Sequence, residues 1–220
     1  MGGHEGMKVL VVGANGQIGK ILCEKLSKNQ FYTPIAMIRH EEQSTYFKEL
    51  GVKTVLGDVE KSVDHLAEVI YGSDAIVFTA GSGGHTGYDK TLLVDLDGAV
   101  KTIEAAEKLG VRRFIMISAI QAHNRENWNK NILPYFVAKH YADRILQQSD
   151  LDYTIIRPGG LLNEAGTGKV SIGENLEHST IPREDVASMI IACLEHEHTY
   201  HRSFDLVSGS ITIDEAVQQL

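Results

Sequence analysis

Short apolar runs alternate with amphipathic stretches along this chain. The first run, MKVLVVG over residues 7–13, is rich in β-branched residues and ends in glycine, which is typical of a buried strand. Residues 17–28 then place Ile18, Ile21 and Leu22 at helical spacing. The same alternation predicts strands at 33–39, 52–58, 73–81, 111–119, 151–159 and 203–209. It predicts helices at 41–51, 62–71, 134–149 and 183–196, a long helix ending near Leu109, and a last helix in ITIDEAVQQL.

Strands that alternate with helices in this way indicate a parallel sheet covered on both faces. The length of 220 residues suits one domain. We therefore predict an α/β fold over residues 7–220, a Rossmann-type doubly wound parallel sheet with a small C-terminal substrate cap. Three irregular segments, 81–90, 120–134 and 159–181, follow the carboxyl ends of predicted strands. Such sheets bind ligands at that edge.

Composition and charge narrow the function classes. Lys and Arg number 21 against 29 Asp and Glu, for a net charge of -8, and no basic stripe suggests a nucleic-acid partner. Because no apolar run approaches the length of a membrane span, we expect no membrane partner. MGGHEG at residues 1–6 lacks the features of a signal peptide, so we treat it as an added leader before a native start at Met7. These features predict a cytoplasmic protein, and they leave both a monomer and a homodimer open.

Cysteine and histidine usage suggests neither disulfides nor a metal. Cys23 and Cys193 both lie in apolar helical patterns, which predicts buried thiols in a reducing compartment. His196, His198 and His201 lie at a predicted helix end beside acidic residues. A solvated helix end explains them better than a metal site, so we predict no metal.

A glycine-rich loop joins the first strand to the first helix. It reads GANGQIG over residues 13–19. Gly13 can make the tight turn, Gly16 lets a pyrophosphate approach the backbone, and Gly19 lets the helix pack on the strand. The free N–H groups of the helix N-terminus then face the phosphates. This strand–turn–helix context predicts a dinucleotide site.

The residues after the next strands indicate which dinucleotide binds. NAD-binding sites of this kind usually carry an acidic residue after the second strand, whereas Arg39 stands here and can grip a 2′-phosphate. We therefore predict NADP, the alternative being a solvated cation. After the third strand, Asp58 could accept from the adenine amino group beside Val59, or it could cap the helix near Ser62.

Three residues form a candidate catalytic group. Ser118 ends the fifth predicted strand, and Tyr135 and Lys139 share a helix face because they are four residues apart. A cation near the phenol would lower its pKa, so that Tyr135 could exchange a proton with a carbonyl or hydroxyl group. Ser118 would hydrogen-bond the same oxygen, and Lys139 would also hold the nicotinamide ribose.

GANGQIG, Ser118, the Tyr135–Lys139 pair and the RPGG at 157–160 together resemble the short-chain dehydrogenase/reductase superfamily. The short length and the string DYTIIRPGGL are similar to its atypical branch, which holds NAD-dependent epimerase/dehydratase-like and NmrA-like proteins. The resemblance implies that Ser118, Tyr135 and Lys139 are catalytic. It implies cofactor contacts by Gly13, Asn15, Gly16, Gln17 and Ile18 (pyrophosphate), Arg39 (2′-phosphate), Asp58 and Val59 (adenine), Ala80, Gly81 and Lys139 (ribose), and Pro158 and Gly159 (nicotinamide).

The chain also departs from that pattern. Asp95 stands where the family has an Asn on the fourth helix, which puts that residue's usual role in doubt. About 60 residues follow the sixth strand, too few to cover a nucleotide sugar, so we do not expect sugar epimerisation. Trp128, in the segment 120–134, could be an aromatic lid over the substrate or could anchor that segment.

We therefore expect an NADP-dependent oxidoreductase that acts on a small carbonyl or hydroxyl compound. A non-catalytic NADP(H)-binding redox sensor is one alternative, although a sensor has no need of an acidified phenol. A flavin- or biliverdin-type reductase is another, in which the placement of the cofactor matters more than Tyr135.

Overall fold

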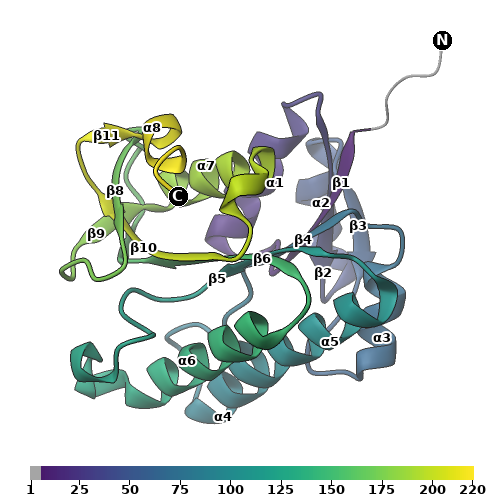
Figure 1. Ribbon diagram of the computed structural model, residues 1–220. Helices are drawn as coiled ribbons and strands as arrows, with labels where there is room; N and C mark the ends of the chain where they lie inside the picture. The colour runs from purple at the N-terminus through teal and green to yellow at the C-terminus, as the bar shows by residue number, and fades with distance from the viewer. Residues whose placement is uncertain (1–5) are drawn as a thin grey trace.

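A nine-stranded sheet crosses the protein in the computed structural model, which describes residues 6–220 (Figure 1). Residues 1–5, most of the predicted leader, lie outside the described part. Seven strands run parallel, in the order β3 (Lys53–Leu56), β2 (Tyr32–Ile38), β1 (Met7–Val12), β4 (Ala75–Phe78), β5 (Arg113–Ile117), β6 (Asp152–Pro158) and β10 (Arg202–Ser208). β8 (Lys169–Gly173) runs antiparallel to β10, and β11 (Ile211–Thr212) antiparallel to β8. The strand order reverses at β1, which confirms the predicted doubly wound sheet.

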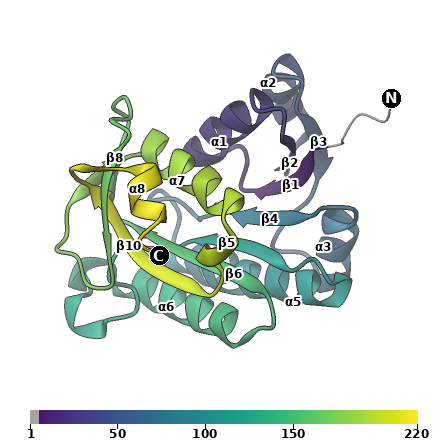
Figure 2. The ribbon, with the colours of Figure 1, turned by 45° about the horizontal axis from the view of Figure 1, so that its top comes forward.

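Helices cover both faces of this sheet (Figures 1 and 2). One face carries α1 (Gln17–Ser27), α2 (Ser44–Glu49), α7 (Arg183–Glu195) and α8 (Ile213–Val217). The other carries α3 (Val63–Ile70), the short α4 (Tyr88–Lys90), α5 (Ala99–Leu109) and α6 (Leu133–Gln148). Every strand and helix predicted from the sequence is present, with boundaries that shift by a few residues. Among residues 6–220, no helix is both long enough and apolar enough to cross a membrane.

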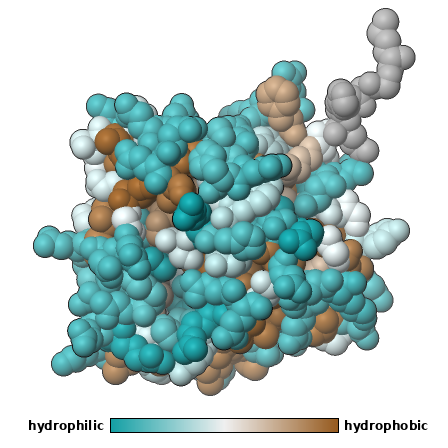
Figure 3. All heavy atoms as spheres, viewed as in Figure 1, coloured by the Kyte–Doolittle hydropathy of each residue, from teal (hydrophilic) through white to brown (hydrophobic). Residues whose placement is uncertain are grey.

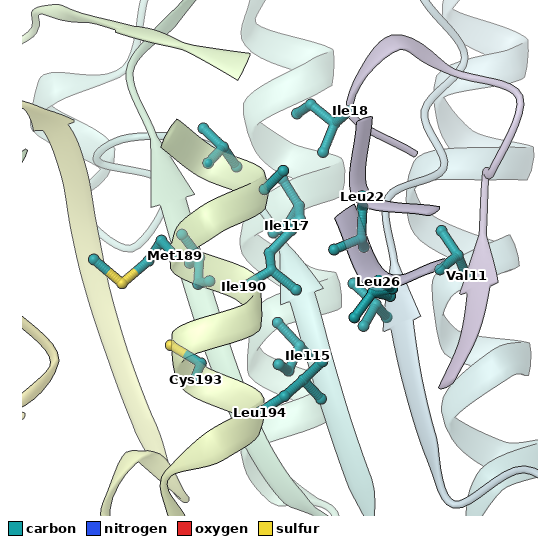
Figure 4. Close-up of a cluster of buried hydrophobic side chains, with 14 of the residues drawn as sticks. Val11, Ile18, Leu22, Leu26, Ile115, Ile117, Met189, Ile190, Cys193 and Leu194 are labelled. Carbon is teal, nitrogen blue, oxygen red and sulfur yellow. The ribbon is translucent and has the colours of Figure 1, made fainter. Parts of the chain in front are cut away.

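Two apolar clusters hold the layers together. Figure 4 shows the cluster between the sheet and helices α1 and α7, to which Leu22 of α1, Ile190 of α7 and Ile115 of β5 belong. All three side chains are fully buried, and burying each one contributes about 1.5–3 kcal/mol. Cys23 and Cys193 lie in the same cluster as free thiols, as predicted, and burial raises the pKa of each to about 12. The side of the molecule seen in Figure 3 is mostly hydrophilic, and its apolar side chains lie in small separate groups.

The structure differs from the prediction in two places. The long fourth helix begins with α4 inside the predicted irregular segment 81–90, passes through a π-helix, η2 (Thr91–Gly98), and continues as α5. The predicted loop 159–181 contains β7 (Gly160–Leu162), β8 and β9 (Thr180–Pro182), with β7 paired to β9 in a small second sheet. The expected C-terminal cap is therefore largely an extension of the main sheet, and only the β7–β9 ribbon stands apart from it.

The glycines of the β1–α1 loop differ in whether the fold leaves room for a side chain. Gly13 has φ +83°, in the left-handed region, and a Cβ there would overlap the backbone of Ala80. A Cβ on Gly19 would overlap the carbonyl oxygen of Gly13 and the backbone of Ala14. A Cβ on Gly16 would meet only the Gly13 oxygen, at 3.3 Å. The fold thus requires Gly13 and Gly19, whereas Gly16 is open toward the sheet edge.

We expect Gly19→Ala to lower the free energy of unfolding by about 1–3 kcal/mol, because the new methyl group overlaps backbone atoms that cannot move apart freely. Helix propensity alone would favour alanine there by about 1 kcal/mol, so a loss isolates the steric effect. Urea unfolding followed by circular dichroism measures it. Gly16→Ala is the matched control and should unfold near the midpoint of the unmodified protein; equal stability of the two variants would contradict the packing role of Gly19.

Candidate active site

Two joined cavities open at the carboxyl ends of the central parallel strands. The larger has a volume of about 640 Å³ and the smaller about 520 Å³. Their linings share Gly16, Thr79, Ala80, Gly81, Ser82 and Thr86. Gly16 of the phosphate loop therefore lies at the junction between them. A dinucleotide has two nucleoside halves joined by a pyrophosphate, and this arrangement fits that shape.

The smaller cavity has the features of an adenosine site. Gly13, Asn15, Arg39 and Val59 all line it. The backbone of the Arg39 loop is fixed because the Gln43 side-chain oxygen accepts from the N–H of Arg39 at 3.0 Å and of His40 at 3.3 Å. The Arg39 side chain is exposed, and within residues 6–220 its guanidinium makes no hydrogen bond or ion pair. A charge held at the rim without a protein partner is available to an anionic ligand.

Asp58 is not among the residues that line this cavity. One of its carboxylate oxygens accepts from the backbone N–H of Glu60 at 2.9 Å, which closes a local turn. Ser62, the N-cap of α3, accepts from the N–H of His65 at 3.2 Å, so the helix is capped without Asp58. The structure thus lends no support to an adenine contact by Asp58, whereas Val59 stays in place for one.

The larger cavity gathers the candidate catalytic residues. Ser118, Tyr135 and Lys139 line it together, although they come from the end of β5 and from two successive turns of α6. Gln17, Ile18 and Pro158 line it as well. Gly159 does not; it packs so closely on the backbone of Ser179 that a Cβ would overlap the carbonyl oxygen there. Its absence of a side chain therefore serves the packing of the β6–β7 turn.

Lys139 is held by a buried ion pair. Its ammonium lies 3.4 Å from Oδ1 of Asp95 and donates to the carbonyl oxygen of Ile117 at 3.3 Å. The two side chains are 6% and 1% exposed. Asp95 reaches the cavity from the π-helix η2, and its second oxygen accepts from the N–H of Ser82 at 3.0 Å. The residue that departs from the family pattern is thus the counter-ion of the candidate catalytic lysine.

The phenol of Tyr135 is less acidic than the sequence suggested. Burial raises the pKa of Tyr135 above its usual value, while the Lys139 ammonium, 5.7 Å from the ring centre, acts to lower it. The carboxylates of Asp95 and Asp143 add to the rise. For the chain alone, the predicted lowering of the Tyr135 pKa is therefore wrong. The phenol keeps its proton at neutral pH and is poised to donate it.

Ser118 bonds to a residue that sequence reasoning missed. Its hydroxyl donates to Oδ2 of Asp143 at 2.7 Å, and both side chains are buried. Burial raises the pKa of Asp143 to about 7, against the Ser118 hydrogen bond and the charges of Arg157 and Lys139, which lower it. The signal was present in the sequence, because Asp143 follows Lys139 by four residues on the face that carries Tyr135.

Two of the irregular segments meet at the mouth of the larger cavity. Tyr88 lines the cavity, and its hydroxyl donates to the carbonyl oxygen of Asn131 at 3.3 Å. Ile132 of the segment 120–134 and Leu161 of the segment 159–181 add apolar side chains to the cavity wall. All three segments that the sequence placed near the substrate therefore contribute to one cavity.

Trp128 anchors its segment and is absent from the cavity lining. Its indole N–H donates to the carbonyl oxygen of Ala122 at 3.1 Å. Its ring stacks on that of Phe136, with the two ring centroids 6.1 Å apart. Of the two roles considered for Trp128, the structure favours the anchor.

Other residues of the cavities carried no readable signal in the sequence. Thr79 directly follows β4, and its hydroxyl donates to the carbonyl oxygen of Val12 at the end of β1, at 2.9 Å. Lys90 pairs with Glu60 at 2.6 Å, and both line the smaller cavity. Arg183 lines the larger cavity and donates to Asn163 at 2.7 Å. Within the described part of the chain, no three His, Cys, Asp or Glu side chains are grouped as a metal site would need.

Comparisons with known proteins agree with this geometry. The profile of a family described as NAD(P)H-binding matches residues 13–197. A Bacillus subtilis (strain 168) protein named "Uncharacterized sugar epimerase YhfK" is 56% identical over 97% of this chain and 100% of its own length.

Two solved structures share the fold. The oxidoreductase ylbE from Lactococcus lactis is 36% identical, with a TM-score of 0.90 over 97% of this chain and 96% of its own. ChuY, an anaerobillin reductase from Escherichia coli O157:H7, is 26% identical, with a TM-score of 0.79 over 94% of this chain and 99% of its own. The chain belongs to the NAD(P)H-binding family, among the atypical proteins related to short-chain dehydrogenases/reductases.

Proposed function

We propose that this protein is an NADP-dependent reductase of a small carbonyl compound, with Tyr135 as the proton donor. One observation carries the proposal: Ser118, Tyr135 and Lys139 line a cavity that shares Gly16 with a second cavity bearing the free cation of Arg39. A catalytic group and a dinucleotide-shaped site thus adjoin. The oxidoreductase ylbE, at 36% identity, supports the reaction class.

Each residue has a separate task. Gly13, Asn15, Gly16, Gln17 and Ile18 hold the pyrophosphate, while Arg39 binds the 2′-phosphate. The reduced dinucleotide, when bound, supplies a hydride to the carbonyl carbon. Tyr135 donates the proton that the carbonyl oxygen needs to become a hydroxyl, Ser118 orients that oxygen, and Lys139 holds the ribose beside the phenol.

The phenol is in the protonation state that carbonyl reduction requires. Because burial is the largest cause that raises the pKa of Tyr135, the residue holds a proton at neutral pH and can give it to the substrate. Sugar epimerisation, the activity in the name of the Bacillus subtilis relative, finds little support in the architecture. The residues after β6 mostly extend the sheet and cover it with α7 and α8, so few remain to enclose a nucleotide sugar.

A second candidate is a reductase in which Tyr135 has no chemical role. The likeness to the anaerobillin reductase ChuY favours it. The apolar wall formed by Ile117, Ile132, Pro158 and Leu161 would suit a large planar substrate. A redox sensor remains the third alternative, and it predicts tight NADPH binding without turnover.

The first prediction of this proposal concerns the choice of cofactor. NADPH should bind more tightly than NADH, and Arg39→Ala should remove most of that difference, a loss of about 1.5–3 kcal/mol for a hydrogen bond to a charged group. Calorimetric titration with both dinucleotides measures it. Arg144→Ala, which removes an exposed arginine of α6 outside both cavities, is the control and should change neither affinity. Equal affinities for NADPH and NADH in the unmodified protein would refute the assignment.

The second prediction separates proton donation from mere cofactor placement. Tyr135→Phe should keep the NADPH affinity and lower the turnover of a carbonyl substrate by roughly 10²–10⁴-fold, the range expected of a general acid. A panel of quinones, aldehydes and ketones, followed by loss of NADPH absorbance, supplies the substrate. Tyr141→Phe is the control, because Tyr141 lies on the same helix outside the cavity lining. Unchanged turnover in Tyr135→Phe would move the reductase without a tyrosine acid ahead.

A further inference from the structure

The hydroxyl of Ser118 carries a single proton, and the protein already uses it. Ser118 donates to Oδ2 of Asp143 at 2.7 Å when Asp143 is a carboxylate, because a carboxylate can only accept. In that state Ser118 has lone pairs but no proton for a substrate carbonyl oxygen. A carboxylic acid at position 143 reverses the bond: the acid donates to Ser118, and the Ser118 proton turns toward the cavity.

The surroundings of Asp143 make the acid form accessible. The side chain is 4% exposed, and its Oδ1 has no hydrogen-bond partner among residues 6–220. A buried carboxylate with one oxygen unsatisfied is costly, whereas a neutral acid loses much less.

The ionisable and hydrogen-bonding groups that face Asp143 come from three elements. Lys139 and Tyr135 lie on the same helix, Arg157 on β6, and Ser118 at the end of β5. Both cations act to lower the pKa of Asp143, but each of them is paired with another carboxylate. Lys139 is paired with Asp95 at 3.4 Å, and Arg157 donates to Asp205 at 2.7 Å. Asp143 is therefore a buried acidic group whose nearest cations are paired with other carboxylates.

We infer that Asp143 is a positioning residue that sets which way the Ser118 hydroxyl points, and that carbonyl reduction uses the state in which Asp143 is protonated. This inference rests on the proposed reductase function, and it adds a regulatory feature to the same site. Protonated Asp143 lets Ser118 donate to the substrate oxygen beside Tyr135. Ionised Asp143 turns Ser118 into an acceptor, which suits a hydroxyl group and not a carbonyl.

The sign of the pH dependence follows. The acid form is the active form, and burial raises the pKa of Asp143 to about 7. The turnover number for reduction, measured with saturating NADPH and substrate, should therefore be highest below that pH and fall as the pH rises through it. The loss of one donor to the reacting oxygen is on the order of 10²-fold.

The decisive comparison is the pH profile of Asp143→Asn. An asparagine has the same shape, cannot ionise, and can donate from its amide to Ser118, so the fall near neutral pH should disappear. Ser118→Ala should be slow at every pH and should show no such fall. Asp150→Asn, an exposed position just after α6, should keep the profile of the unmodified protein. A fall that persists unchanged in Asp143→Asn overturns the inference.

Infrared spectroscopy gives a readout that needs neither substrate nor dinucleotide. A carboxylic acid band should titrate near neutral pH in the unmodified protein and be missing in Asp143→Asn. In Ser118→Ala its frequency should shift, because the acid loses its partner. No band titrating near neutral pH, or a band that Ser118→Ala leaves in place, refutes the assignment even if Asp143→Asn fails to fold. Failure of the reductase proposal shows itself differently, as unchanged turnover in Tyr135→Phe or as no carbonyl reduced.

Discussion

The buried charge of Lys139 is the constraint around which the catalytic side of this protein is built. An ammonium that is 6% exposed is destabilising unless other groups compensate its lost hydration. Burial acts to lower the pKa of Lys139, yet the ionisable groups around it, among them its ion-pair partner Asp95, raise it on balance, so the charge is retained. Removing the partner of such a buried charge typically costs about 3–5 kcal/mol. The wider turn of the π-helix η2, which carries Asp95 to within 3.4 Å, thus supports the stability of the site as well as its shape.

That compensation has a consequence for the chemistry. A lone ammonium would acidify the neighbouring phenol, but a lysine paired with a carboxylate contributes a much smaller net charge. Burial, with the Asp95 carboxylate adding to its effect, raises the pKa of Tyr135 and keeps it protonated, and the same cluster leaves Asp143 without a cation paired to it alone. In the reduction that we propose, two proton-bearing groups would therefore serve the reacting oxygen, the phenol directly and Asp143 through Ser118. Groups whose pKa values are shifted in one cavity are a frequent mark of a functional site.

How far the sequence predicts this arrangement depends on which interaction fixes each part. The alternation of strands and helices, the glycine loop and the Tyr135–Lys139 pair follow from apolar periodicity and from fixed spacings, which are local properties of the chain. The π-helix depends on how residues 91–98 meet α6 and the β3–α3 turn, where a Cβ on Gly98 would lie 2.9 Å from Val59. No local pattern encodes that contact. The adenine contact of Asp58 stays a prediction: the residue is not among those that line the smaller cavity, and one of its carboxylate oxygens accepts from the backbone N–H of Glu60 in its own loop.

The two halves of the site also differ in what holds them. The cofactor half is fixed by backbone packing at Gly13 and Gly19, where any side chain would overlap neighbouring atoms. The substrate half is held on one side by a buried polar network, in which Asp205 pairs with Arg157 and accepts from Gln121. Gln121 has φ +62°, an unfavourable conformation for a residue with a side chain, so this network fixes the backbone after β5 against a local cost.

Part of the wall of the larger cavity is built from a segment that includes Gly81, Gly83, Gly84 and Gly87, and most of that segment is exposed. Exposed, glycine-rich backbone with few buried contacts tolerates sequence change better than a buried network does. A change of substrate within this family would therefore arise most readily at Gly83, Gly84, Gly87 and Tyr88, which line the larger cavity and not the smaller one, because such a change leaves the dinucleotide loop, the Lys139–Asp95 pair and the Asp205 network intact.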